Sequence, residues 1–187
     1  MRCKSKAIFL DRDGTINEDV GDFCSVEKLK FIEGSLEALK LLQKEFLLFI
    51  ITNQTGIDKG IFTEEEFLEF NKTYLDILYT NGIEIKQVLY CPHKKEKNCV
   101  CRKPSTYFIN LLKDKYDLDL SKSFSIGDHP HDVEMGFAAG TKTIYLLTGH
   151  GQKHLEELVK KPDFVAKNLY EASLWILNNI YEKQNSC

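Results

Sequence analysis

The sequence contains no long hydrophobic run. No stretch of the 187 residues approaches about 18 uninterrupted apolar residues, the length at which a helix begins to span a bilayer. Residues 1–6 are polar and lead directly into the first apolar run, without the apolar region of a secretory signal. We therefore expect a cytoplasmic protein that has no membrane partner.

The sequence also lacks a strong charge of either sign. The formal net charge is -3, and no long basic stripe is present. This balance gives no support to a nucleic-acid partner. A small basic patch at Lys94, Lys95 and Lys97 is the one local excess of positive charge that needs an explanation.

Internal repeats, low-complexity tracts and linkers are absent as well. Hydrophobic residues make up 43% and charged residues 28%, which is ordinary for a globular protein, and the length suits one domain. We expect a single domain over residues 1–187, a monomer, and a phosphorylated small molecule as the binding partner.

Strand-like and helix-like segments alternate along the whole chain. Apolar runs of four to six residues indicate buried strands, and apolar residues at spacings of three and four indicate helices. This alternation predicts an α/β fold with a doubly wound, mostly parallel, Rossmann-like sheet and no large cap domain. The expected strands are 7–10, 46–51, 85–90, 123–126, 143–147 and 163–165, and the expected helices are 34–44, 63–81, 105–116, a short one ending at 139, 154–160 and 169–181.

Two carboxylates, Asp11 and Asp13, follow the first expected strand at once. Adjacent carboxylates repel each other unless a cation or a shared proton lies between them. The pair therefore indicates a metal or acid–base site. The alternative on these two residues alone is a polar turn after a strand.

Polar side chains also follow three later strands. Because the carboxyl ends of parallel strands meet at one edge, these residues should gather around the first pair. Carboxylates held near Mg²⁺, together with a hydroxyl and a lysine, make a phosphoryl-transfer site. At the strand end Asp11 is the better nucleophile, and Asp13 is the general acid and then base. The later strand-end residues are Thr52 and Asn53, then Arg102 and Lys103, and finally Asp128 and Asp132.

A cysteine-rich loop precedes Arg102 and Lys103. Its spacing, Cys91-x-His93-x5-Cys99-x-Cys101, has the donor set of a closed, structural, tetrahedral Zn²⁺ site. The alternative is a set of buried free thiols. We expect zinc to stiffen this loop so that it presents Arg102 and Lys103 to the phosphate. The remaining cysteines, Cys3, Cys24 and Cys187, receive no role.

Together these motifs resemble the four motifs of the haloacid dehalogenase superfamily of phosphatases. They are Asp11-x-Asp13-Gly-Thr, Thr52-Asn-Gln, Lys103-Pro and Gly-Asp128-x3-Asp132. The resemblance implies Asp11 as nucleophile, Asp13 as acid–base residue, Thr52 and Lys103 on the phosphoryl group, and Mg²⁺ bound by Asp11, Asp13 and Asp128. It further implies substrate contacts from Asp19, Asp22, Asn53, Gln54, Thr55, Arg102 and His129.

The cysteine loop narrows the resemblance to a zinc-containing branch. That branch holds the heptose bisphosphate phosphatases and the histidinol-phosphate phosphatases. Residues 52–66 resemble the former, which implies D-glycero-D-manno-heptose 1,7-bisphosphate as substrate and its 7-phosphate as the group removed. Histidinol phosphate is the alternative. A departure is His129, where the sugar phosphatases usually have lysine or arginine.

Two alternatives of other classes remain. Receiver-like phosphoacceptor modules also gather aspartates, a threonine and a lysine around Mg²⁺, but they lack a second aspartate two residues after the acceptor. A zinc-stabilised binding scaffold would leave the strand-end residues without a task. We expect His131 to lie either against substrate or in solvent, and His150 to lie at the surface.

Overall fold

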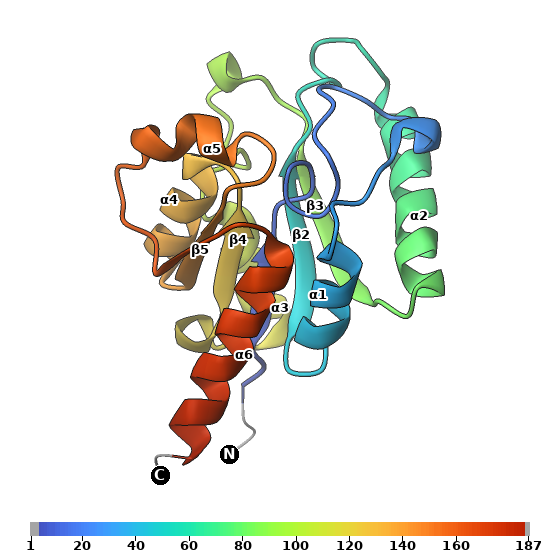
Figure 1. Ribbon diagram of the computed structural model, residues 1–187. Coiled ribbons are helices and arrows are strands. Elements are labelled where there is room, and N and C mark those ends of the chain that lie inside the picture. Colours follow the sequence, from blue (N-terminus) through green and yellow to red (C-terminus); the bar gives the residue numbers. More distant parts are fainter. Residues whose placement is uncertain (1–3, 186–187) are drawn as a thin grey trace.

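A six-stranded parallel sheet forms the centre of the molecule (Figure 1). The computed structural model describes residues 4–185, with side chains to residue 180, so Cys3 and Cys187 lie outside the described residues. The strand order is β3-β2-β1-β4-β5-β6, and each pair is parallel. The strands are β1 (Ala7–Leu10), β2 (Leu47–Asn53), β3 (Ile85–Cys91), β4 (Phe124–Gly127), β5 (Lys142–Leu146) and β6 (Phe164–Ala166).

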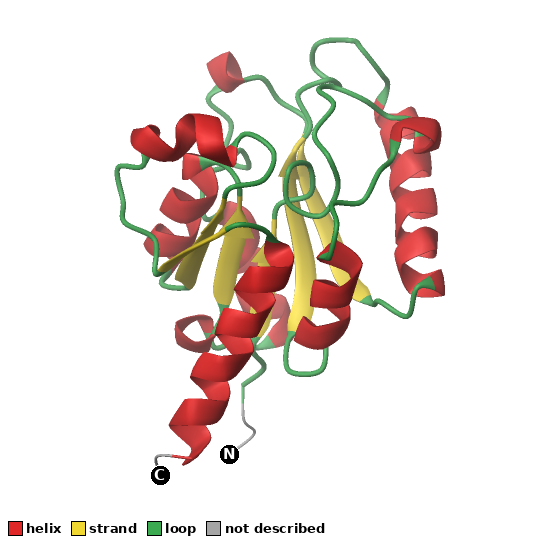
Figure 2. Cartoon of the chain, viewed as in Figure 1, coloured by secondary structure: helices red, strands yellow, loops and turns green. Residues whose placement is uncertain are grey.

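Helices cover both faces of this sheet (Figure 2). They are α1 (Ser35–Leu42), α2 (Glu64–Thr80), α3 (Tyr107–Tyr116), α4 (Pro130–Ala139), α5 (Gly151–His154) and α6 (Leu169–Asn185). The expected doubly wound α/β fold is confirmed, and no large cap covers the sheet within the described residues. No described helix is long and apolar enough to cross a membrane.

The alternation of side chains along β1 divides the core into two halves. Ile8 and Leu10 belong to a cluster that includes residues of α1, α2 and α6. Ala7 and Phe9 point to the other face and pack with residues of α3 and α4. Side chains of a strand alternate between faces, so a strand buried on both sides is apolar throughout. The two layers hold β1 rigidly, and the residue after it, Asp11, therefore starts from a fixed point.

The order and parallel direction of the strands set the position of the site. β1 is the first strand, β2 and β3 lie to one side of it, and β4, β5 and β6 lie to the other. In open α/β sheets, ligands bind outside the carboxyl ends of the strands, where the direction of winding changes. Here that point lies between β1 and β4.

The α2 helix begins as its sequence predicts. The Thr63 hydroxyl accepts the Glu66 N–H at 3.1 Å, and the Glu66 carboxylate accepts the Thr63 N–H at 2.7 Å. This capping box satisfies two of the N–H groups that a helix leaves without an intrahelical partner.

One expected helix differs from the structure. Residues 154–160 were predicted as one helix, but α5 covers Gly151–His154 and a 3-10 turn follows at Leu155–Glu157. The backbone is extended at Leu158 (ψ 106°), which stops the turn before residue 160. Since α5 starts next to the loop after β5, it lies beside the site.

Candidate active site

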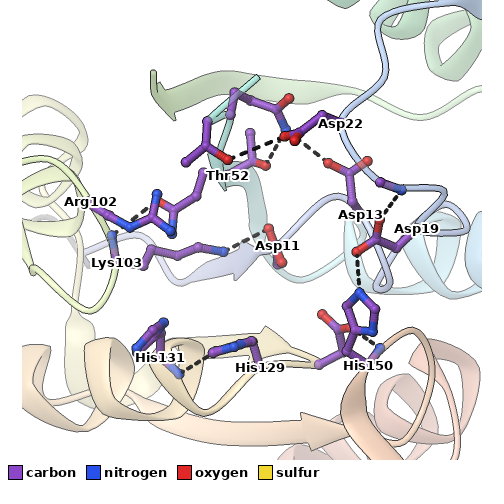
Figure 3. A pocket seen from close by; sticks show the side chains of 15 residues that line it. Asp11, Asp13, Asp19, Asp22, Thr52, Arg102, Lys103, His129, His131 and His150 are labelled. Carbon is purple, nitrogen blue, oxygen red and sulfur yellow. Dashed lines mark hydrogen bonds and ion pairs between the residues drawn. The ribbon is translucent and has the colours of Figure 1, made fainter. Parts of the chain in front are cut away.

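A pocket of about 330 Å³ opens at the carboxyl edge of the sheet (Figure 3). Its wall includes each residue that the sequence analysis assigned to catalysis or substrate binding. The lining residues are Asp11, Asp13, Asp19, Gly21, Asp22, Thr52, Asn53, Gln54, Thr55, Arg102, Lys103, Asp128, His129, His131 and His150.

Three carboxylates from different elements lie close together, and two of them, Asp11 and Asp128, line this pocket. Asp11 follows β1, Asp128 follows β4, and Asp132 lies in the first turn of α4; each offers an oxygen within 4.8 Å of the others. Lys103 enters the group from the loop after β3, and its Nζ lies 2.7 Å from an oxygen of Asp11 and 2.7 Å from one of Asp132. One buried cation therefore faces three acidic groups.

The excess of carboxylates over cations in this cluster changes the pKa values of its members. Burial raises the pKa of Asp11 to about 7; Asp132 and Asp13 add to the rise, and Lys103 opposes it. Burial and the neighbouring acids raise the pKa of Asp128 to about 8. Burial acts to lower the pKa of Lys103, but Asp11 and Asp132 outweigh it and raise that pKa. Lys103 is therefore a permanent cation.

This donor set suits a hard divalent cation. Mg²⁺ prefers carboxylate oxygens and is usually held by only a few of them, with positions left for water and phosphate. The group that the structure brings together is Asp11, Asp128 and Asp132. The carboxylate of Asp13, which the resemblance assigned to Mg²⁺, lies outside this group, because other side chains hold it.

Two glycines allow the loops to close around Asp128. Gly14 (φ +79°) and Gly149 (φ +52°) have left-handed backbone, and a Cβ on either would overlap the Asp128 carboxylate. The His150 N–H donates to Asp128 at 2.7 Å. Thr148 Oγ1 donates to the Gly14 carbonyl at 2.6 Å and so joins the loops after β5 and β1.

Asp13 also lines the pocket, but a separate set of side chains holds it. Arg12 donates to its two oxygens at 3.0 and 2.7 Å, and Asn17 and Gln54 each donate at 2.9 Å. Burial alone would raise the pKa of Asp13, but the Arg12 guanidinium outweighs it and holds that pKa below its usual range. Asp13 is therefore an ionised, fixed carboxylate, which is the form that accepts a proton.

The last residues of β2, Thr52 and Asn53, and the next residue, Gln54, connect these two networks. Gln54 Nε2 also donates to the Thr52 hydroxyl at 2.9 Å, so one amide holds both Thr52 and Asp13. The Asn53 side-chain oxygen accepts the Lys103 N–H at 3.2 Å. Asn53 thereby ties the loop of Lys103 to the edge of the sheet.

The cysteine loop brings its four expected zinc donors together. The sulfur atoms of Cys91, Cys99 and Cys101 lie 3.2–3.6 Å apart, and His93 Nδ1 lies 3.7 Å from Cys91 and 3.4 Å from Cys101. A tetrahedral zinc with Zn–S bonds of about 2.3 Å places its sulfur ligands about 3.7 Å apart. The donor set and the spacing both suit Zn²⁺. Arg102 Nη1 donates to the His93 carbonyl at 3.0 Å, so this group also positions Arg102.

The loop after β1 forms the outer wall. Asp19 lies 3.1 Å from Nε2 of His150, and Asp22 accepts hydrogen bonds from Lys59 at 2.6 Å and from Thr55 at 3.3 Å. From the sequence, His150 is expected at the surface. Its side chain is 52% exposed, and it also lines the pocket, because β5 delivers its carboxyl end to the same edge.

Two further histidines lie along the floor. The rings of His129 and His131 are 4.4 Å apart, and both line the pocket. Burial lowers the pKa of His129 to about 4, and His131 adds to the shift. His129 is therefore neutral at pH 7 and offers a hydrogen bond rather than a charge.

The strand-end residue Asp132, which the sequence named without a role, joins the acidic group. Two residues of the site were not found from the sequence: Arg12 holds Asp13, and Gly149 allows the close approach to Asp128. Gly149 follows a strand that ends at the active edge, which was the available signal. No pattern pointed to Arg12.

The chain is similar to known proteins over most of its length. Residues 100–172 match the family model described as HAD-hydrolase-like. A D-glycero-alpha-D-manno-heptose-1,7-bisphosphate 7-phosphatase of Campylobacter jejuni is 37% identical over 183 residues, which cover 96% of this chain and 98% of that protein. A D-glycero-beta-D-manno-heptose-1,7-bisphosphate 7-phosphatase of Pasteurella multocida is 34% identical over 171 residues, 88% and 92% of the two chains.

A solved structure shares the fold over the same extent. The D,D-heptose 1,7-bisphosphate phosphatase of B. bronchiseptica, complexed with magnesium and phosphate, superposes with a TM-score of 0.86 at 28% identity. The match covers 93% of this chain and 99% of that one.

Proposed function

Because the chain belongs to the heptose-bisphosphate phosphatases of the haloacid dehalogenase-like hydrolases, we propose that it removes the 7-phosphate of D-glycero-D-manno-heptose 1,7-bisphosphate. The chain is a phosphatase, a hydrolase of phosphomonoesters, like these relatives. The sugar bisphosphate is the proposed substrate because proteins named for it match this chain over nearly its full length.

The observation that carries the proposal is that two aspartates line one pocket and are held by different partners. Asp11 lies in the acidic group beside the Lys103 ammonium, 2.7 Å away. Asp13 lies in the pocket wall with its carboxylate held by other donors. A nucleophile and a separate acid–base group are the two parts that hydrolysis through a covalent intermediate requires.

The first half of the reaction forms an aspartyl-phosphate. Asp13 is ionised in the free protein, so it first takes up a proton as the substrate binds. An oxygen of Asp11 then attacks the phosphorus, the bond between phosphorus and the sugar oxygen breaks, and the sugar oxygen takes the proton from the Asp13 carboxyl. Lys103 and the Thr52 hydroxyl hold the phosphoryl oxygens and stabilise their charge.

The second half releases phosphate. Asp13, now a carboxylate, takes a proton from water as the water oxygen attacks phosphorus, and the bond from phosphorus to Asp11 breaks. Asp11 returns as a carboxylate and Asp13 as a carboxyl, so protons balance over the cycle. The low pKa of Asp13 beside Arg12 keeps its carboxylate ionised before this step, in the form that can accept a proton.

Two metals are part of the proposal. Asp11, Asp128 and Asp132 would hold Mg²⁺, which supplies charge neutralisation for the phosphoryl group when bound. Cys91, His93, Cys99 and Cys101 would hold Zn²⁺. The zinc site would have a structural role, because its four donors leave no open position.

Arg102 and the outer wall give the proposed pocket its substrate contacts. Arg102 is held at the rim by the His93 carbonyl and offers a cation for a second anionic group. Asp19 and Asp22 supply acceptors for sugar hydroxyls on the opposite wall. A phosphorylated sugar combines both kinds of group.

A panel of phosphate esters tests the substrate. With Mg²⁺ present, kcat/KM should be at least about tenfold higher for the heptose 1,7-bisphosphate than for histidinol phosphate, a difference of about 1.4 kcal/mol in transition-state binding. Both anomers of the heptose belong in the panel, because relatives named for each match this chain. A preference for histidinol phosphate by the same factor would overturn the proposed substrate.

The Asp13→Asn variant tests the catalytic roles. Loss of turnover, with Asp11 still open to phosphorylation by a reactive phosphate donor, is the expected result. If stable phosphorylation of Asp11 were the same with and without the substitution, and neither protein turned over, the receiver-like alternative would hold instead.

A further inference from the structure

Arg12 is a buried cation between the two catalytic aspartates. It is 1% exposed and ranks among the largest fully buried side chains of the described residues. A buried charge costs several kcal/mol unless it is paired and hydrogen-bonded. The position adjoins the main apolar cluster, where an uncharged side chain would pack without that cost. The cation at this position therefore needs an explanation beyond packing.

The partner of this cation is Asp13. Arg12 Nε donates to Oδ1 at 3.0 Å and Nη2 donates to Oδ2 at 2.7 Å, a bidentate arrangement. Within the described part of the chain, Nη1 has no hydrogen-bond partner. Two-point binding fixes the plane of a carboxylate as well as its position.

Four aromatic rings surround the guanidinium on its other sides. The Arg12 Cζ atom lies 5.2–6.0 Å from the centres of the rings of Phe23, Phe67, Phe70 and Tyr74, which we call the aromatic cage. Such distances are those of cation–π contacts, which strengthen when water is excluded. Phe23 comes from the loop after β1, and the other three come from α2.

From this geometry we infer that Arg12 is a positioning residue: it holds the Asp13 carboxylate at the pocket wall, and the aromatic cage anchors it to α2 and to the loop after β1. The inference rests on the proposed function, in which Asp13 exchanges a proton with leaving group and water. Arg12 itself is buried behind Asp13 and does not line the pocket.

A double-mutant cycle tests this inference. The kcat and KM values of wild type, Arg12→Met, Asp13→Asn and the double variant would be measured with p-nitrophenyl phosphate and Mg²⁺. If Arg12 acts through Asp13, Arg12→Met should lower kcat about 100-fold, within the range of general acid–base catalysis. KM should change less than about threefold, because neither side chain is proposed to bind substrate.

The decisive comparison is between the double variant and Asp13→Asn. Their kcat values should agree within about twofold, since removing Arg12 cannot harm a proton transfer that is already lost. A double variant about 100-fold slower than Asp13→Asn would overturn the inference and leave the role of Asp13 intact. Wild-type turnover in Asp13→Asn would instead contradict the proposed function and, with it, the inference.

Two more variants distinguish a loss of positioning from a failure to fold. Arg12→Lys keeps the buried charge but loses bidentate binding, so its kcat should lie between those of wild type and Arg12→Met. Lys30→Met removes an exposed lysine that pairs with Glu18 in the loop after β1, and it should leave kcat unchanged. If Arg12→Lys and Arg12→Met each kept the full wild-type kcat, the inference would be overturned.

Discussion

At the scale of single residues, the acidic group of the site has more carboxylates than Lys103 pairs with. Lys103 lies 2.7 Å from both Asp11 and Asp132, and Asp128 has no such contact with it. The raised pKa values of Asp11 (about 7) and Asp128 (about 8) express this shortage of positive charge. A divalent cation would supply what Lys103 alone does not.

The first prediction concerns pH and metal. Because the folded pKa values of Asp11 and Asp128 exceed the unfolded value of 3.8, the folded protein binds more protons than the unfolded chain. The stability that this provides is complete below about pH 4 and is lost as pH rises through about 7 to 8. Mg²⁺ should offset the loss, so it should raise Tm more at about pH 8.5 than at about pH 5.

Thermal unfolding in EDTA and in Mg²⁺ at both pH values measures this effect. Asp128→Asn is the control, since it removes one of the two raised groups and should shrink the pH dependence of the Mg²⁺ shift. An equal or larger Mg²⁺ shift at the lower pH would contradict the prediction.

At the scale of elements, the cysteine loop is a short segment between β3 and α3. It contains one 3-10 turn, Lys95–Lys97, and its position depends on four side chains that converge near the end of β3. Arg102 and Lys103 follow the last of these directly. The Asp58 carboxylate accepts the Lys94 N–H at 3.0 Å and lies 3.9 Å from Lys97 Nζ, so an acidic side chain faces part of the small basic patch.

The second prediction is that the loop depends on zinc. Cys99→Ser should lose the bound zinc and lower kcat/KM about 10- to 100-fold, because Arg102 and Lys103 are no longer held in place. Metal analysis and steady-state kinetics measure the two effects. Cys24→Ser, outside the loop, is the matched control and should change neither. The prediction is falsified if a folded, zinc-free protein keeps full activity.

The third prediction concerns the start of α2, which carries three rings of the aromatic cage. Thr63→Ala removes the side-chain half of the capping box and should lower the free energy of unfolding by about 1 kcal/mol. Thr73→Ala, at a partly exposed position of the same helix, removes only a bond to the Glu69 carbonyl and should cost much less. Denaturant titration of both variants separates them, and equal losses would contradict the role of the cap.

At the scale of the whole molecule, loops from strands that are not neighbours close over Asp128. β1 and β5 are separated by β4 in the sheet, yet Thr148 binds the Gly14 carbonyl and His150 binds Asp128. Gly149 lies where the loop after β5 comes closest to Asp128 and to the backbone of Gly14. A twisted parallel sheet brings such loops together at its carboxyl edge.

The fourth prediction follows from this contact. Gly149→Ala should weaken Mg²⁺ binding about tenfold or more, because the new Cβ would overlap Asp128 and displace it. Gly140→Ala is the control: its φ is also positive, at +80°, but its Cβ would meet nothing within 4 Å. Gly140→Ala should therefore lose about 1 kcal/mol of stability from backbone strain alone and keep its Mg²⁺ affinity. Mg²⁺ titrations that gave the same affinity for both variants would contradict this account.

Much of the fold was predictable because its signals are local. The apolar run before Asp11 and the Thr63–Glu66 capping pattern depend on neighbours within a few residues, and both were confirmed. The helix predicted over residues 154–160 was wrong, because the start of α5 depends on where the loop after β5 turns back over the sheet. That contact is distant in sequence and leaves no periodic signal.

The sequence by itself determined the order of strands and helices, the residues that end at the active edge, and the donor set of the cysteine loop. These features follow from periodicity and from short spacings, because residues that are close in sequence are held close together by the backbone. Only the tertiary structure decided which carboxylates share a group: it joined Asp132 to Asp11 and Asp128 and turned the Asp13 side chain away. That choice depends on Arg12, whose burial against α2 no local pattern could show.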